Sequence, residues 1–127
     1  MTTYSQVKKL VSEFEVNYPR SCRVDLDILS PIDTMEMWQN ADRAGVYFLF
    51  DKNDGLQYIG KASMSSSIGA RIGVRFSSKN NSCVDLTFSD VTQIATIPMD
   101  DGHEFEAPAI EEYFIKLLTP PLNVTGK

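Results

Sequence analysis

Residues 45–60 read GVYFLFDKNDGLQYIG, and this stretch decides the fold that the sequence predicts. Residues 46–50 are apolar and aromatic, as in a buried β-strand, and residues 56–59 return to that pattern after a polar interval. The interval contains Asp54 followed by Gly55, a pair that tolerates the positive φ angles of a tight turn. We therefore predict a β-hairpin over this stretch.

Each strand of the predicted hairpin carries a short tyrosine–glycine triplet, residues 45–47 (GVY) and residues 58–60 (YIG). Because side chains alternate across a strand, Tyr58 is expected on the same face as Leu56 and the glycine of its own triplet. Glycines in strands allow another backbone or a ligand to approach closely. On the strand pattern alone, the interpretation of Tyr47 and Tyr58 as ordinary core aromatics is favoured.

Two amphipathic helices are predicted after the hairpin, over residues 66–77 and residues 108–118. Arg71 and Arg75 share one face of the first helix, because they are four residues apart. Pro108 suits the first turn of the second helix, and a proline pair stops that helix. Apolar side chains mark the buried face of the first helix at Ile68, Ile72 and Phe76.

A third strand is predicted over residues 91–98 (VTQIATIP), which are β-branched and alternating. The expected fold class is therefore α+β, a small three-stranded antiparallel sheet flanked by helices. Residues 43–127 are expected to form this module as one globular unit. Residues 1–42 are expected to be an N-terminal helical and strand extension that packs on the core.

The extension begins with a predicted helix whose start resembles a capping box formed by Thr3 and Gln6. Its apolar stripe consists of Val7, Leu10, Val11 and Phe14. Residues 24–29 (VDLDIL) alternate like a short strand, and Asp33 is placed to cap a short helix that would run through Met37 and Trp38.

Taken in order, these features resemble the GIY-YIG nucleases over about residues 44–124. One triplet alone is a weak signal, whereas the ordered set is specific. The resemblance implies a module that cleaves phosphodiester bonds in DNA with a divalent metal, Mg²⁺ or Mn²⁺. It rests on both triplets, Lys61 behind the second triplet, Arg71 in the following helix, Glu111 in the last helix, and a PPLN segment that ends at Asn123.

The resemblance also implies roles for these residues, and their chemistry agrees with it. Arg71 carries a planar, permanently charged guanidinium that suits phosphate oxygens and would stabilise the transition state. Glu111 would hold one metal ion, because Mg²⁺ keeps several waters and takes other ligands from the substrate. Tyr47 would act as general base if nearby cations lowered the pKa of its hydroxyl. Tyr58 and Lys61 would position or tune the substrate.

Three further positions are less specific. Asn123 would shape the site, although an asparagine after a proline pair is also a simple turn former. Arg75 lies one turn from Arg71 and is a second candidate for a phosphate contact. Glu112 is expected to be solvated, because adjacent helix residues point about 100° apart. His103 is the only histidine, and its polar surroundings favour a surface loop.

The charge of the chain is unevenly distributed, with a net value of −5. Residues 43–79 carry six Lys or Arg against two Asp, whereas residues 80–112 carry eight acidic residues and no Lys or Arg. Because phosphate contacts supply most nucleic-acid affinity, we expect weak, salt-sensitive DNA binding by the isolated chain. The acidic surface allows a homodimer or a partner protein. The alternative to a nuclease is a catalytically idle module that binds nucleic acid or a partner protein.

The remaining composition is that of an ordinary 127-residue globular chain. No apolar run approaches the roughly 20 residues of a membrane helix, and the first residues lack a signal-peptide pattern. Cys22 and Cys83 form no metal-type pair and favour a reducing compartment, so a cytoplasmic location is expected.

Overall fold

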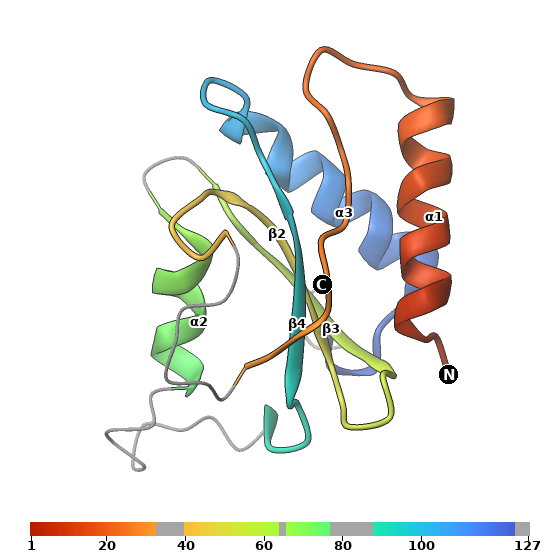
Figure 1. Ribbon diagram of the computed structural model, residues 1–127, viewed down its shortest axis with the longest axis vertical. Coiled ribbons are helices and arrows are strands. Elements are labelled where there is room, and N and C mark those ends of the chain that lie inside the picture. Colours follow the sequence, from red (N-terminus) through yellow and green to blue (C-terminus); the bar gives the residue numbers. More distant parts are fainter. Residues whose placement is uncertain (33–39, 64–65, 77–87, 124–127) are drawn as a thin grey trace.

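The structure, a computed structural model, describes residues 1–32, 40–63, 66–76 and 88–123, except for the side chains of residues 73–76. Over these residues the chain forms a four-stranded antiparallel sheet with helices on both faces. Helices α1 (Tyr4–Asn17) and α3 (Ala107–Leu118) lie on one face, and α2 (Ile68–Phe76) lies on the other (Figure 1). The predicted α+β class is therefore confirmed. In this described part of the chain no helix is long and apolar enough to cross a membrane.

The sheet is built around the predicted hairpin. Strand β2 (Gly45–Phe50) lies in the centre and pairs with β3 (Leu56–Ala62) on one side and β4 (Gln93–Pro98) on the other. All six residues of β2 are buried, since helices cover both faces of the sheet there. The prediction of three strands was incomplete, because the short strand β1 (Ser30–Pro31) adds a fourth beside β4.

The stretch over residues 24–29 is not the strand that its alternation predicted. Val24 and Leu26 are buried as a strand face would be, yet the pairing with β4 is carried by one residue. The backbone N–H of Asp27 donates to the carbonyl oxygen of Thr96 at 3.0 Å, and its side-chain Oδ1 accepts from the Thr96 N–H at 2.7 Å. A carboxylate thus takes the place of a backbone carbonyl, so no regular ladder forms. The helix predicted from Asp33 lies outside the described residues.

Helix α1 confirms its sequence signals. The Thr3 hydroxyl accepts a hydrogen bond from the Gln6 N–H at 3.4 Å, and the Gln6 side chain accepts one from the Thr3 N–H at 2.9 Å. This capping box satisfies two N–H groups that have no partner inside the helix. The helix ends two residues before Pro19, and its apolar stripe packs on the sheet.

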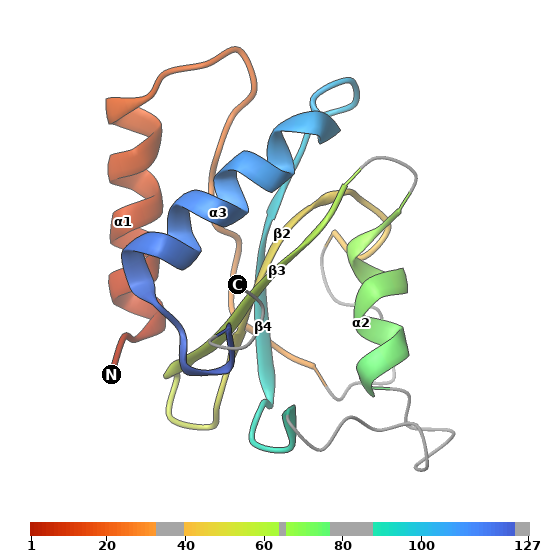
Figure 2. The same ribbon diagram turned by 180° about the vertical axis from the view of Figure 1, so that it is seen from behind.

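Two hydrophobic cores lie on the two faces of the sheet. Figure 2 shows the helices over these faces, α1 and α3 on one and α2 on the other. The first contains Phe48 of β2 and Phe114 of α3 together with the stripe of α1. The second contains Tyr47 of β2 with Ile68 and Ile72 of α2. Successive residues of a strand point to opposite faces, so this arrangement directs Tyr47 towards α2 and away from α1 and α3.

A β-bulge in the hairpin changes which face one residue takes. Leu49 pairs with Tyr58, but Phe50 pairs with Leu56, so Gln57 is an extra residue in β3. Leu56 consequently lies in the core with α1 and α3, whereas Tyr58 packs against the core under α2. The expectation that Leu56 and Tyr58 share a face was wrong, because simple alternation does not hold across a bulge.

The pH dependence of stability is expected to change when Asp27 is replaced by asparagine. Burial raises the pKa of the Asp27 carboxyl, although hydrogen bonds from Thr96 and Asn40 and the charge of Lys8 oppose the rise. A raised folded-state pKa means that the folded protein holds the proton more tightly than the unfolded chain does. Protonated Asp27 therefore makes a favourable contribution to the stability of the fold at low pH. That contribution is lost as the pH rises from the usual value near 3.8 through the higher folded pKa.

As the pH increases through this range, the free energy of unfolding of the wild type should therefore fall relative to that of Asp27→Asn. Urea unfolding at a series of pH values measures it. Asp25→Asn, on the same segment but exposed, controls for the change in net charge. A difference that does not vary with pH would contradict the expectation.

Candidate functional site

The two tyrosines of the hairpin lie together on the α2 face of the sheet. Their ring centroids are 6.3 Å apart, and the ring planes are inclined at 36°. Tyr47 is only 1% exposed, whereas Tyr58 lies on the edge strand and is partly exposed. The hairpin thus holds one phenol inside the core and the other at its border.

The glycines of the triplets are explained by close contacts. Gly60 stands directly opposite Tyr47 in the hairpin, and a Cβ atom added to it would lie 2.7 Å from Cε1 of the Tyr47 ring and still nearer its hydroxyl end. The Tyr47 ring can therefore lie flat across β3 only over a glycine. A Cβ on Gly45 would collide with the carbonyl oxygen of Ile97 and lie 3.0 Å from Cα of Pro98. Both glycines allow close approach that any side chain would block.

Helix α2 presents Arg71 to solvent. The Ser67 hydroxyl accepts a hydrogen bond from the Ala70 N–H at 3.1 Å and so satisfies an N–H at the start of the helix. Ile68 and Ile72 are fully buried on the face towards the sheet. Arg71 lies between them in sequence and is exposed, as the helical period requires. The side chain of Arg75, the second candidate, lies outside the described part.

Glu111 is positioned by the buried face of α3. Ile110 and Phe114 fix the helix against the sheet, and Glu111 is half-buried while its neighbour Glu112 is exposed. Burial is the largest influence on the Glu111 carboxyl and raises its pKa, and the charge of Glu112 acts in the same direction. The two adjacent glutamates thus differ in exposure, and the prediction that Glu112 is solvated is confirmed.

Two basic side chains lie within electrostatic reach of Glu111. The positive charges of Lys61 and Arg71 both lower the pKa of its carboxyl, although burial outweighs them. Lys61 belongs to β3, Arg71 to α2 and Glu111 to α3, so three elements contribute to one group of charges. The fold brings these three predicted residues together.

Glu111 is the carboxylate that this group of charges offers to a metal ion. Among the described residues no group of three or more His, Cys, Asp or Glu is placed to hold one. The Glu111 carboxylate is half-buried with a raised pKa, and within the described chain it forms no hydrogen bond or ion pair. A divalent cation would relieve the cost of burying this charge. Mg²⁺ is commonly held by one or two carboxylates with waters and substrate phosphates completing the shell, so the donor set fits it.

Asn123 fastens the edge of the sheet beside Tyr58. It ends the 3₁₀-helix η4 (Pro121–Asn123), and its side-chain Oδ1 accepts from the Ile59 N–H at 2.9 Å. Its Nδ2 donates to the Ile59 carbonyl oxygen, also at 2.9 Å. The amide therefore pairs with β3 as a residue of a further strand would, and it fixes the backbone between Tyr58 and Gly60.

Replacing Asn123 with leucine is expected to lower the free energy of unfolding by about 1–3 kcal/mol, because two hydrogen bonds to a partly buried backbone are lost. Chemical denaturation measures this change. The same substitution at Asn53 is the matched control and should change stability by less than about 0.5 kcal/mol. Asn53 is an exposed turn residue whose side chain forms no hydrogen bond in the described structure. Equal stability of wild type and Asn123→Leu would show that the two hydrogen bonds between Asn123 and Ile59 contribute nothing to stability.

His103 lies away from this group and has a structural role. Its Nδ1 lies 2.8 Å from Oε2 of Glu106, which also forms an ion pair with Arg20. Burial raises the pKa of Glu106, but the hydrogen bonds and charges of His103 and Arg20 outweigh it and leave that pKa below its usual range. These contacts join η3 (Glu104–Glu106) to the loop after α1.

Of the two cysteines, Cys22 is buried and unpaired, and Cys83 lies outside the described residues.

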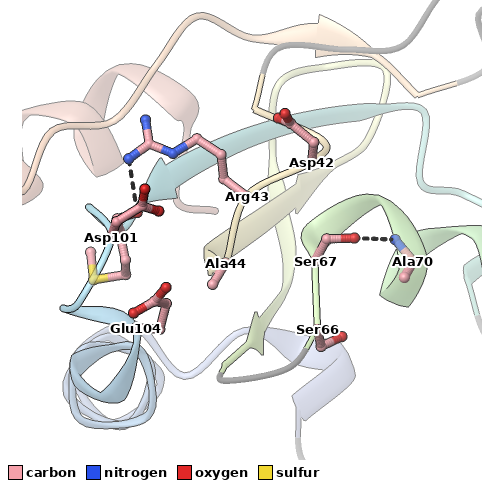
Figure 3. A pocket seen from close by; sticks show the side chains of 9 residues that line it. Asp42, Arg43, Ala44, Ser66, Ser67, Ala70, Asp101 and Glu104 are labelled. Atoms are coloured by element: carbon pink, nitrogen blue, oxygen red, sulfur yellow. Dashed lines mark hydrogen bonds between the residues drawn. The ribbon is translucent and has the colours of Figure 1, made fainter.

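None of the predicted site residues lines the hollow of about 720 Å³ that the described structure contains. Figure 3 shows the side chains that line it. Ser67, which caps α2, and Ala70, in the first turn of α2, line one side of it, and the segments before β2 and after β4 line the rest. Asp42, Asp101 and Glu104 line it, and the guanidinium of Arg43 is engaged with the Met99 carbonyl oxygen at 2.8 Å. This acidic lining repels anions such as phosphate, whereas Lys61 and Arg71 place positive charge near Glu111.

One aromatic contact of the site has no signal in the sequence. Phe88, from the turn before β4, packs edge-on against the ring of Tyr58 with centroids 4.9 Å apart. Thirty residues separate the two in the chain, and neither periodicity nor a motif marks Phe88. It is recognised as part of the site only through the fold.

Comparison of the sequence with models of known protein families gives no match, and comparison with curated proteins gives none either.

Proposed function

We propose that this protein is a metal-dependent DNA endonuclease of the GIY-YIG type. The observation that carries the proposal is the position of the half-buried Glu111 within reach of Lys61 and Arg71, next to a hairpin that bears two tyrosines. Hydrolysis of a phosphodiester needs an activated water and stabilisation of the charge that develops on the phosphoryl oxygens. A site that had lost this activity would be expected to have lost at least one of these groups.

The arrangement of elements supports the same proposal. In the GIY-YIG-like module, β2, β3 and β4 form the three-stranded sheet, with α2 after the hairpin and α3 after the last strand. Helix α1 and strand β1 are then additions that cover one face and one edge. The order of hairpin, arginine helix, strand, glutamate helix and final asparagine is the order in which the resemblance places them.

Each residue has a role in this proposal. Arg71 contacts the phosphate and stabilises the charge of its transition state, and Lys61 adds positive charge beside it. Glu111 holds Mg²⁺ or Mn²⁺, which when bound supplies further positive charge to the phosphate oxygens. Tyr47 removes a proton from the attacking water, and Tyr58 positions the substrate at the exposed border of the site.

A second function is favoured by the overall charge. With a net charge of −5 and an acidic hollow beside the site, the chain repels extended nucleic acid outside its basic patch. This supports a module that works with a homodimer partner or another protein, or one that binds without cutting. In the nuclease proposal the same acidity makes DNA binding weak and strongly salt-dependent.

Arg71→Ala is expected to lower the rate of Mg²⁺-dependent nicking of supercoiled plasmid by about 100- to 1,000-fold, the usual cost of losing one donor to a developing oxyanion. Its exposure means that the free energy of unfolding should change by less than about 0.5 kcal/mol. Nicking rates at saturating enzyme, with urea unfolding in parallel, measure both.

Arg23→Ala is the matched control for this experiment. Arg23 is also an exposed arginine, and it lies 3.8 Å from Asp25 on the N-terminal segment. Both variants change the net charge equally, so a general loss of electrostatic attraction would slow both. Equal rates for Arg71→Ala and Arg23→Ala would contradict the role of Arg71, and the absence of nicking by the wild type with either metal would favour the binding module.

A further inference from the structure

Three aromatic rings form a row on the α2 face of the sheet. The Phe88 ring meets the Tyr58 ring at 4.9 Å with an interplanar angle of 88°, and the Tyr58 ring lies 6.3 Å from that of Tyr47. The first contact is an edge-to-face arrangement, which aromatic pairs prefer over a parallel sandwich. The row leads from the turn before β4 across the edge strand to the central strand.

Phe88 is the fixed member of this row. It is only 4% exposed and belongs to the same core as Ile68 and Ile72 of α2. Its carbonyl oxygen accepts a hydrogen bond from the Val91 N–H at 3.0 Å, and the next N–H, that of Thr92, donates to the Phe50 carbonyl oxygen at 2.9 Å. The turn that carries Phe88 is thus tied to the central strand.

Tyr58 is the member of the row that lies at the border of the core. It lies on the edge strand β3, directly after the bulge, and its side chain is partly exposed. The staggered rotamer about the Cα–Cβ bond sets where a tyrosine ring and its hydroxyl point, because the hydroxyl oxygen lies on the Cβ–Cγ axis and does not move when the ring turns about that bond. The rotamer at such a position depends on what the ring packs against, and the neighbours of the Tyr58 ring include Phe88 at 4.9 Å and Tyr47 at 6.3 Å.

We propose that Phe88 is a positioning residue of the candidate site, which sets the orientation of the Tyr58 ring and, through it, the direction of the Tyr58 hydroxyl. The inference rests on the proposed nuclease function, for which Tyr58 positions the substrate. Phe88 carries no polar group and acts through the Tyr58 ring that it contacts. Its effect is on the chemical step, because misplacing a positioning group changes the rate far more than it changes binding.

The opposite face of the sheet offers a matched pair. Phe48 of β2 is fully buried and packs edge-on against Phe114 of α3, with centroids 5.9 Å apart and an angle of 71°. This pair is likewise an edge-to-face contact made by a buried phenylalanine of the sheet region, but it lies in the core with α1 and α3, on the face opposite to Tyr47 and Tyr58. A loss of core packing alone would affect the two pairs alike.

The test compares three variants in single-turnover and steady-state cleavage of a labelled DNA duplex with Mg²⁺. Phe88→Met removes the ring at similar volume, Phe88→Tyr keeps the ring, and Phe48→Met is the control. Phe88→Met should lower kcat about tenfold with KM changed less than twofold, because only orientation is lost. Phe88→Tyr should retain wild-type kcat, and Phe48→Met should retain kcat within about twofold although urea unfolding shows a similar loss of stability.

A readout that does not depend on cleavage accompanies these rates. The ring of Phe88 shifts the NMR resonances of the Tyr58 ring, so those resonances in tyrosine-labelled protein should move in Phe88→Met and stay in place in Phe48→Met. Equal loss of kcat in both methionine variants, or Tyr58 resonances unchanged in Phe88→Met, would overturn the positioning role. If the wild type does not cleave DNA, the proposed function fails by itself, and the resonances alone decide whether Phe88 orients Tyr58.

Discussion

Glu111→Gln is expected to lower Mg²⁺-dependent DNA cleavage by at least about 100-fold, because glutamine cannot supply the charged ligand that the metal requires. In the described part of the chain Glu111 is the carboxylate with both Lys61 and Arg71 acting on it. No cluster of other acidic or histidine side chains in that part stands ready to replace it. The loss should appear in the single-turnover rate at saturating metal and enzyme.

The same substitution should leave the protein at least as stable as the wild type. Burial raises the pKa of Glu111, so the folded state prefers the protonated form. As the pH rises above the usual glutamate value, ionisation of this group in the folded protein costs stability, and the cost is complete above the raised pKa. Glutamine carries no charge and removes that cost at neutral pH. Activity and stability should therefore change in opposite directions, which marks a residue kept for function.

Glu112→Gln is the matched control, since it removes the same charge from the adjacent, exposed position on α3. Its cleavage rate should remain within about twofold of the wild type, as expected for an exposed side chain that the chemical step does not use. Denaturant unfolding of both variants at neutral pH supplies the stability comparison. Equal losses of activity in Glu111→Gln and Glu112→Gln, or a marked fall in stability for the former alone, would contradict the assignment.

Gly60→Val is expected to lower the free energy of unfolding by about 3 kcal/mol, at the upper end of the cost of overpacking a core. The first atom of the new side chain would meet the Tyr47 ring, with 2.7 Å to Cε1 and less to the hydroxyl end. Tyr47 is fully buried between β3 and α2, so there is no free space into which the new side chain could displace its ring. Displacement of Tyr47 should also abolish cleavage if this tyrosine activates the water.

Gly55→Val provides a control in the same hairpin. There the added atom would meet the Met1 side chain, 2.7 Å from its sulfur, and a flexible terminal methionine moves at little cost. Urea unfolding of the two valine variants should differ by about 2 kcal/mol, the difference between a rigid and a yielding neighbour. Equal stabilities would show that Tyr47 does not lie against Gly60 in solution.

The parts of the fold that the sequence predicted well are those set by local rules. Three signals act within one or two turns of helix: the capping box at Thr3 and Gln6, the spacing of Ile68 and Ile72, and the early proline of α3. Helices α2 and α3 appear within two residues of their predicted bounds. The central hairpin follows in the same way from an apolar strand and a turn at Asp54, which has a φ of 63°.

The parts that the sequence did not predict depend on partners far along the chain. Residues 24–29 alternate like a strand, but the Asp27 side chain meets Thr96, which is 69 residues away, and replaces the ladder. The bulge at Gln57 also escapes a pattern of simple alternation. Local propensity has no information about either, because both are decided by what packs against the segment.

The candidate site shows the same division. The sequence marked Tyr47, Tyr58, Arg71 and Glu111 through an ordered pattern, and the fold explains why glycines stand beside the tyrosines. It gave no sign of the Phe88 contact, and it offered no partner for Asn123, whose amide binds the Ile59 backbone from 64 residues away. Residues that act through others leave no motif, since any side chain of suitable shape would serve.

Nicking of supercoiled plasmid by the wild-type chain at low salt, with Mg²⁺ and with EDTA, tests the central claim that Glu111, Arg71 and the paired tyrosines form a metal-dependent phosphodiesterase site. Low salt is needed, because the acidic chain is expected to bind DNA weakly. We expect nicked circles to accumulate with Mg²⁺, and we expect none to form with EDTA or with the Glu111→Gln variant. Intact plasmid with Mg²⁺ and Mn²⁺ alike, or nicking that persists in EDTA, would contradict it.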